Sequence, residues 1–190
     1  MILIVDNYDS FTFNLHQALA ALPELAGEEL RVVRNDAETV ETLAAWEPRA
    51  VILSPGPGHP RDAGLSLTLP DALPETPILG VCLGHQALAL AAGARITRSP
   101  RPTHGRRVAI EHDGGRPLVG LPSPFDAALY HSLVVVDGNL PDELEVCARS
   151  VAGDIMALRH RARPHCGVQF HPESFMTEHG PRLLADLLTW

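Results

Sequence analysis

Short apolar runs alternate with longer amphipathic segments over the first ninety residues of the chain. The apolar runs are bounded by turn residues and have strand length, and they fall at residues 2–5, 30–33, 50–53 and 78–81. The segments between them have helical spacing, and they fall at residues 11–21, 37–45, 65–72 and 84–92. Asp9 or Ser10 can cap the first of these helices, and Gly93 can end the last.

The later part of the chain has a different pattern, with short β-like runs separated by Gly, Pro and Asp turns. These runs are residues 107–111, 127–129, 133–136, 144–148, 155–159 and 166–170, and Pro181 then opens a closing helix over residues 181–188. Alternating strands and helices form parallel sheets with helices on both faces. We therefore expect one α/β domain over residues 1–190, with an open, mostly parallel central sheet and additional antiparallel strands in its C-terminal half.

Composition and charge remove several classes of function. The chain is 45% hydrophobic and 20% charged, which is enough apolar material to bury a core. All 15 basic residues are arginine, so a lysine Schiff base, a pyridoxal-phosphate lysine and a Walker-A lysine are excluded. The net charge of −8 argues against nucleic acid as a partner. We expect no cofactor and no metal.

The cysteines and the apolar runs indicate where the protein works. No apolar run approaches the roughly 18–20 residues that span a bilayer, so no membrane contact is expected. Met1 is followed directly by Ile-Leu-Ile-Val-Asp without a basic segment, which is unlike a signal peptide. Cys82, Cys147 and Cys166 are an odd number at scattered spacing, which fits neither a disulfide framework nor a zinc ribbon. We expect a reducing, cytoplasmic location.

The stretch around Cys82 carries the strongest chemical signal. Gly80 and Gly84 flank Cys82 two residues to either side, between an apolar strand and an Ala-rich helix. This is the pattern of a nucleophile elbow with Cys in place of Ser, where the helix N-terminus favours a thiolate and offers N–H groups to an oxyanion. The alternative is a small buried hydrophobic residue, which is the favoured interpretation for Cys147 and Cys166.

A thiol nucleophile needs a base, and His171 is the candidate among ten histidines. Pro172 favours an extended backbone at His171, so Glu173 would project to the same side and orient the imidazole. A strand-end histidine beside a solvated glutamate is the alternative. Residues 54–60, Ser-Pro-Gly-Pro-Gly-His-Pro, form a stiff loop whose glycines can bring N–H groups to a ligand, and they lack the phosphate-loop pattern.

These three stretches, in this order, resemble the class I (triad) glutamine amidotransferases. Residues 6–14, Asp-Asn-Tyr-Asp-Ser-Phe-Thr-Phe-Asn, and residues 130–133, Tyr-His-Ser-Leu, narrow the resemblance. They look like the glutaminase subunits of anthranilate synthase (component II) and aminodeoxychorismate synthase. The resemblance covers nearly the whole chain, and five motifs in the right order are far more specific than any one of them.

The resemblance implies a role for each matching residue. It implies a Cys82 nucleophile, a His171 base oriented by Glu173, hydrolysis of L-glutamine through a thioester, and ammonia passed to a chorismate-binding synthase subunit. Glutamine hydrolysis would be slow alone and faster with that partner. The oxyanion and glutamine would be held by Gly56, Pro57, Gly58, Leu83, Gln86, Ser132 and Leu133.

Two positions depart from the pattern of the family. Arg106 stands where the family usually has Lys, and Leu129 stands where it usually has Arg. Arg98, Arg101, Arg106 and Arg107 surround a proline-rich stretch, which is part of a docking face, a charge gate near the ammonia exit, or a solvated loop.

Other interpretations remain open at this point. They are the glutaminase subunit of GMP synthetase, a stand-alone γ-glutamyl cysteine hydrolase, and a catalytically inactive binding or regulatory partner. The opening segment 6–14 has a simple interpretation too, in which Tyr8 and Phe11 are core residues.

Overall fold

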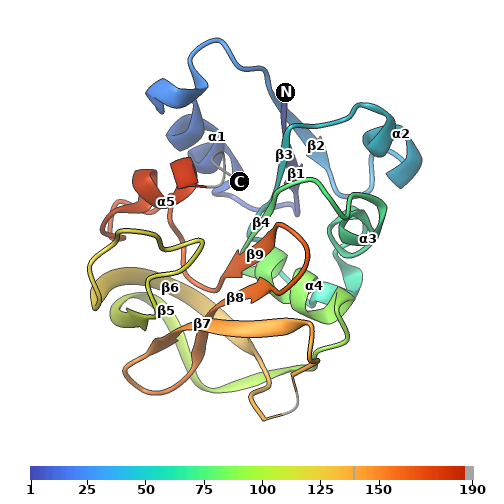
Figure 1. Cartoon of the computed structure of the whole chain (residues 1–190). Helices are drawn as coiled ribbons and strands as arrows, with labels where there is room; N and C mark the ends of the chain where they lie inside the picture. The colour runs from blue at the N-terminus through green and yellow to red at the C-terminus, as the bar shows by residue number, and fades with distance from the viewer. Residues whose placement is uncertain (139, 187–190) are drawn as a thin grey trace.

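The computed structural model describes residues 1–138 and 140–186, and it arranges them around a nine-stranded sheet (Figure 1). The strand order is β2-β1-β3-β4-β9-β8-β7-β5-β6. The strands from β2 to β9 pair in parallel, and all pairings from β9 to β6 are antiparallel. The predicted α/β class, with antiparallel strands in the later part of the chain, is confirmed.

The parallel part of the sheet closely follows the predicted apolar runs. Its strands are β1 (Ile2–Asp6), β2 (Leu30–Arg34), β3 (Ala50–Leu53), β4 (Ile78–Val81) and β9 (His165–Val168). The last of these was predicted to reach residue 170, but the strand ends at Val168. It comes from far along the chain and pairs with β4, so it completes the parallel part beside the strand that leads to Cys82.

Helices cover both faces of this sheet. In Figure 1, α1 and α5 lie on the left of the parallel strands, and α2 and α3 lie on the right. The helices are α1 (Thr12–Ala20), α2 (Val40–Ala45), α3 (Leu65–Ala72), α4 (Leu83–Ala91) and α5 (Gly180–Asp186), with 3₁₀ turns η1 (Pro23–Leu25) and η2 (Pro60–Asp62). The predicted residues 187–188 of the last helix lie outside the described residues. No helix in the described part of the chain is long and apolar enough to cross a membrane.

Side chains along β1 point alternately to the two faces of the sheet and join a different hydrophobic cluster on each face. Ile2 and Ile4 pack in a cluster with side chains of α1 and α5, whereas Leu3 and Val5 pack with side chains of α2, α3 and α4. All four side chains are fully buried, as expected for a strand with helices on both faces. The core therefore fixes α4, and with it the residue that precedes α4, against the sheet.

The start of α1 differs from the prediction. The helix begins at Thr12 with Phe11 as its N-cap, and no side chain caps it. The carboxylate of Asp9 instead accepts a hydrogen bond from the N–H of Phe11 at 2.8 Å, one residue before the helix. Asp9 therefore orders the turn that leads into α1, and the predicted capping by Asp9 or Ser10 is wrong.

The antiparallel part consists of β5 (Ile96–His112), β6 (Phe125–Val135), β7 (Leu144–Ser150) and β8 (Ile155–His160). The runs predicted at 127–129 and 133–136 belong to the single strand β6, and the arginine-rich stretch is strand rather than loop. Between Arg98 and Thr103 the register of β5 against β6 shifts. The prolines of the stretch lie at this bulge, where no ladder hydrogen bond is required of them.

Candidate active site

The candidate site lies where the parallel strands end. Asn7 follows β1, Ser54 follows β3, Cys82 follows β4 and Gln169 follows β9. The carboxyl ends of parallel strands meet at one edge of a sheet, which is where open α/β folds bind ligands. The fold therefore gathers the predicted segments around Cys82.

Cys82 sits in a strained turn between β4 and α4. Its φ of 51° and ψ of −99° lie in a region that residues other than glycine rarely adopt, and such strain is typical of functional positions. The Cys82 N–H donates to the carbonyl of Val168 at 2.8 Å, and the Cys82 carbonyl accepts from the N–H of Gln86 at 3.1 Å. These two bonds hold the residue between β9 and the first turn of α4.

The flanking glycines allow this turn to pack. A Cβ at Gly80 would lie 2.5 Å from backbone atoms of Gly84, and a Cβ at Gly84 would collide with the carbonyl oxygen of Leu53. Neither position has room for a side chain, because the neighbouring atoms belong to the backbone. The predicted elbow geometry is therefore present.

His171 and Glu173 form a buried pair. His171 Nδ1 and Glu173 Oε1 are 2.6 Å apart, and their side chains are 4% and 2% exposed. The backbone here is a turn in which Ser174 N–H donates to the His171 carbonyl at 3.2 Å. The expected pairing is thus present, but the extended backbone from which it was predicted is not.

The surroundings of His171 favour its charged form. Burial by itself would lower the pKa of His171, but interactions with Cys82 and Glu173 outweigh burial and raise the pKa to about 10. These two interactions favour the imidazolium form of His171. Its Nε2 atom is buried and makes no hydrogen bond within the described residues, while Nδ1 is held by Glu173. This arrangement leaves Nε2 as the nitrogen that can exchange a proton.

Backbone and aromatic contacts fix the His171 ring. The His171 N–H donates to the carbonyl of Ala128 at 3.1 Å, and the Thr177 hydroxyl donates to the His171 carbonyl at 2.6 Å. The rings of Tyr130 and Phe11 meet the imidazole edge-on, with centroids at 5.0 and 6.4 Å. Thr177 was not predicted, because nothing in the sequence marks a threonine whose partners are backbone atoms.

The loop after β3 packs over the start of α4. A Cβ at Gly56 would lie 2.5 Å from the carbonyl oxygen of Asn7 and 2.9 Å from Cδ2 of Leu83. Asn7 anchors the loop, since its side-chain amide donates to the Ser54 carbonyl at 2.8 Å. Gly58 has a φ of 82° and turns the chain after Pro57. The predicted oxyanion donors, Gly56 and Leu83, are thus neighbours, and the Leu83 N–H is a first-turn donor without a helical acceptor.

Two of the predicted glutamine-binding residues, Gln86 and Leu133, belong to a hydrogen-bonded chain. Gln86 Nε2 donates to the Leu133 carbonyl and to Gln169 Oε1, both at 3.0 Å. Gln169 Nε2 in turn donates to the sulfur of Cys82 at 3.5 Å. Ser132 is exposed, and its hydroxyl is 2.9 Å from Nε2 of His104. Gln169 was not predicted, because its partners lie 83 and 87 residues away in the chain.

A cavity of about 230 Å³ adjoins the His171–Glu173 pair. It is lined by Phe11, Asn14, Tyr130, His171, Glu173, Ser174 and Phe175. Phe175 is 91% exposed, and Tyr8 and Phe11 are 50% and 41% exposed. The interpretation of Tyr8 and Phe11 as core residues is therefore wrong, and the exposed rings of Phe11 and Phe175 line this cavity.

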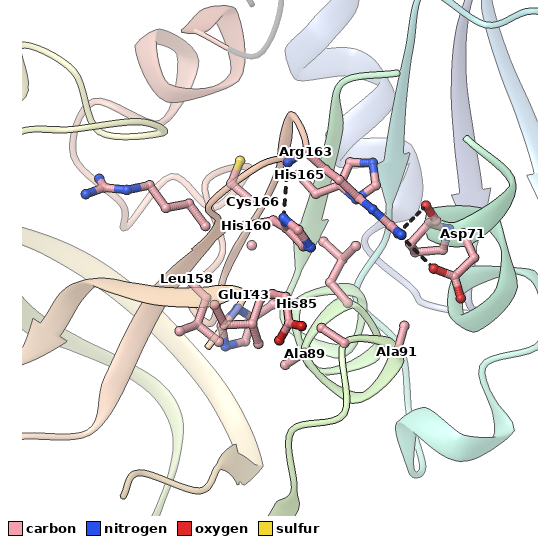
Figure 2. Close-up of a pocket in the computed structure, with 16 residues that line it drawn as sticks. Asp71, His85, Ala89, Ala91, Glu143, Leu158, His160, Arg163, His165 and Cys166 are labelled. Atoms are coloured by element: carbon pink, nitrogen blue, oxygen red, sulfur yellow. Dashed lines mark hydrogen bonds and ion pairs between the residues drawn. The ribbon is translucent and has the colours of Figure 1, made fainter. Parts of the chain in front are cut away.

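A second cavity, of about 180 Å³, contains none of the candidate catalytic residues (Figure 2). It lies between α4, β8 and β9, and Figure 2 shows the Arg163 side chain reaching Asp71 at its edge. Its wall includes His85 and His165, and burial lowers the pKa of each to about 4. Both histidines are therefore neutral at pH 7, whereas Asp71, Glu143, Arg159 and Arg163 bring charged side chains to the same cavity.

The two other cysteines have a different environment from Cys82. Burial raises the pKa of Cys147 to about 12 and raises that of Cys166 well above its ordinary value. Both are therefore thiols at neutral pH and poor nucleophiles. Within residues 1–138 and 140–186, no three His, Cys, Asp or Glu side chains come together as a metal site.

Comparison with known proteins agrees with this geometry. The family described as Glutamine amidotransferase class-I matches residues 3–189. Anthranilate synthase component 2 of Azospirillum brasilense is 48% identical over 190 residues, which cover 99% of this chain and 95% of the relative. Aminodeoxychorismate/anthranilate synthase component 2 of Bacillus subtilis is 46% identical over 189 residues, with 99% and 95% covered. A Thermoplasma acidophilum crystal structure, named for a GMP synthase subunit, superposes with a TM-score of 0.86 at 26% identity, covering 99% and 92%. The chain belongs to the class I glutamine amidotransferase family.

Proposed function

We propose that this protein is the glutaminase subunit of a chorismate-aminating synthase. Its substrate is L-glutamine, and its product ammonia serves a chorismate-binding partner subunit that makes anthranilate or 4-amino-4-deoxychorismate. The observation that carries the proposal is the strained Cys82 elbow together with the buried His171, whose Nδ1 lies 2.6 Å from Oε1 of Glu173. The family and the names of the two similar relatives support the same activity.

The geometry supports a thioester mechanism with defined proton transfers. The Cys82 sulfur attacks the side-chain carbonyl carbon of glutamine, and the carbonyl oxygen becomes an oxyanion facing the Gly56 and Leu83 N–H groups. His171 gives its Nε2 proton to the departing nitrogen, and ammonia leaves as the C–N bond breaks. His171 then takes a proton from water, which attacks the γ-glutamyl thioester and releases glutamate and the Cys82 thiolate.

Glutamine binding is assigned to the loop after β3 and to one end of β6. Gly58 lies in the loop, and Ser132 and Leu133 lie on β6 close to Gln86. The glutaminase subunit of GMP synthetase is the alternative function. It is less favoured, because the structure named for that enzyme is 26% identical, whereas the two synthase components are 46% and 48% identical.

We place the reaction in the cytoplasm. All three cysteines are free and buried, and the proposed chemistry requires a reduced thiol at Cys82. We further propose that the protein works in a hetero-oligomer, because ammonia released into water would diffuse away before it reached the partner subunit.

Replacing the nucleophile tests the function. Cys82→Ser is expected to lower glutamine-dependent amination of chorismate at least about a thousandfold in the reconstituted complex, since the hydroxyl is a much weaker nucleophile than the thiolate. Amination driven by ammonium salt should remain at the wild-type rate, which controls for assembly of the complex. A Cys82→Ser complex that still uses glutamine would contradict the proposal.

A further inference from the structure

We propose that Gln169 is a further residue of the reaction centre, which donates a hydrogen bond to the Cys82 sulfur and fixes the orientation of Gln86. Its side chain is fully buried and makes contacts at both ends of its amide group. The inference rests on the proposed function, because it matters for the reaction only if Cys82 is the nucleophile.

The orientation of the two amides follows from a fixed acceptor. The carbonyl oxygen of Leu133 can only accept, so Gln86 must turn its Nε2 toward Leu133. The other hydrogen of Gln86 Nε2 then points at Gln169, which must present Oε1 to accept it. The Nε2 of Gln169 is thereby left facing Cys82, with its N–H directed at the sulfur at 3.5 Å. A reversed amide at either residue would place two donors or two acceptors against each other.

A buried N–H group facing sulfur favours the thiolate. Hydrogen bonds to an ionised partner are stronger than neutral ones, and a buried environment strengthens them further. The His171 side chain is the other group that interacts with the Cys82 sulfur. In the proposed reaction Gln169 therefore stabilises negative charge on the sulfur and directs the sulfur while His171 gives up its proton.

The same chain determines what Gln86 can offer to a substrate. Both hydrogens of its Nε2 are used by Leu133 and Gln169, so only Oε1 remains for another contact. Gln86 must therefore act as an acceptor toward a substrate N–H group. Loss of the Gln169 oxygen would let the Gln86 amide rotate, and the KM for glutamine should then rise.

The test measures the pH dependence of Cys82 alkylation by iodoacetamide. In Gln169→Met, which keeps the side-chain length but has no donor, the midpoint of the rate profile should move up by about one pH unit. In Gln169→Glu the shift should be larger, because a carboxylate then faces the thiolate. Gln169→Asn withdraws the amide by one methylene, so it should shift the profile like Met, and it serves if the Met variant does not fold.

A matched control separates this role from general damage to β9. Cys166→Ala removes buried volume from β9, the strand that leads to Gln169, and its alkylation profile should coincide with that of the wild type. A folded Gln169→Met protein with an unshifted profile overturns the inference and leaves the proposed function standing. The proposed function fails separately, if alkylation of Cys82 in the wild type leaves glutamine hydrolysis intact.

Discussion

At the scale of single residues, the glycines around the nucleophile serve close approach rather than flexibility. Gly56, Gly80 and Gly84 have ordinary backbone angles, whereas Cys82 itself takes the positive φ. What the three glycines share is backbone within 2.6 Å of where a Cβ would be. The strain of the turn is therefore carried by the reactive residue, and its neighbours only leave it room.

Gly84→Ala should destabilise the protein by about 3 kcal/mol or more, because the new methyl group would meet the Leu53 carbonyl and push α4 away from β3. Urea unfolding measures this free energy. Gly115→Ala is the matched control, since the nearest atoms there belong to the Arg159 and Asp113 side chains, and it should cost less than about 1 kcal/mol. Equal losses in the two variants would contradict the packing argument.

Sequence patterns marked the proposed reacting groups but not the residues that hold these groups in place. Cys82 was marked by its glycine spacing, and His171 by the proline and glutamate that follow it. Gln169 and Thr177 have no such mark, because their importance comes from atoms of other segments. Residues of this kind can be recognised only from the folded structure, in which strand pairing brings their hydrogen-bond partners close.

At the scale of elements, the contact between α4 and β9 determines the site. A Cβ at Gly167 would lie 2.8 Å from Nδ1 of His85, so the helix approaches the strand as closely as its side chains permit. Both nitrogens of His85 are buried, and burial lowers the pKa to about 4 although a contact with the Gly167 backbone favours the charged form. The contact therefore depends on His85 staying neutral.

Stability should fall as the pH is lowered from about 6.5 toward 4. The pKa of His85 is about 4 in the folded protein and 6.5 when unperturbed, so in this window the unfolded chain binds the extra proton. His85→Leu should remove up to about 3 kcal/mol of this loss, as measured by urea unfolding at pH 7 and pH 4.5. The exposed His179→Asn control, at a positive φ that Asn tolerates, should keep the wild-type pH dependence. An unchanged slope in His85→Leu would show that another group is responsible.

Element boundaries were predictable where turn residues bound them. Strands β3 and β4 and helix α3 have the predicted limits, because proline and glycine stand beside them. Of strand β5, only residues 107–111 were predicted, because proline favours loops and Pro100 and Pro102 lie in the part that precedes them. They are tolerated because β5 pairs only with β6 over this stretch and is bulged there. Whether a strand tolerates proline depends on how it pairs with its neighbours, and local sequence does not show this pairing.

At the scale of the whole molecule, two exposed surfaces are candidates for docking. Arg98, Arg106 and Arg107 are exposed on β5, while Arg101 is engaged by Asp154 at 2.8 Å. The aromatic face, which we define as Phe11, Phe13 and Phe175, comprises two rings that line the cavity beside His171 and one ring on α1. Exposed apolar rings beside the proposed reaction centre suit a docking surface better than the arginines do.

Phe175→Ser should weaken binding of the synthase subunit by about tenfold or more, because the ring is 91% exposed and would be buried on docking. Titration calorimetry with the purified partner measures the affinity. Val151→Ser is the control, since Val151 is 66% exposed but lies in the turn between β7 and β8. Equal affinities for the Phe175 variant and the wild type would show that the partner does not dock on Phe175.

The late position of β9 has a consequence for the order of events during synthesis. The strand that leads to Cys82 keeps one open edge until residues 165–168 arrive, and the bond from the Cys82 N–H to Val168 forms only then. Gln169 and His171 emerge from the ribosome directly afterwards. Cys82 is thus translated roughly midway through the described chain. It can contact Gln169 and His171 only when almost all of that chain has been made. Contacts of such long sequence separation form slowly, so reactivity at Cys82 reports completion of the fold.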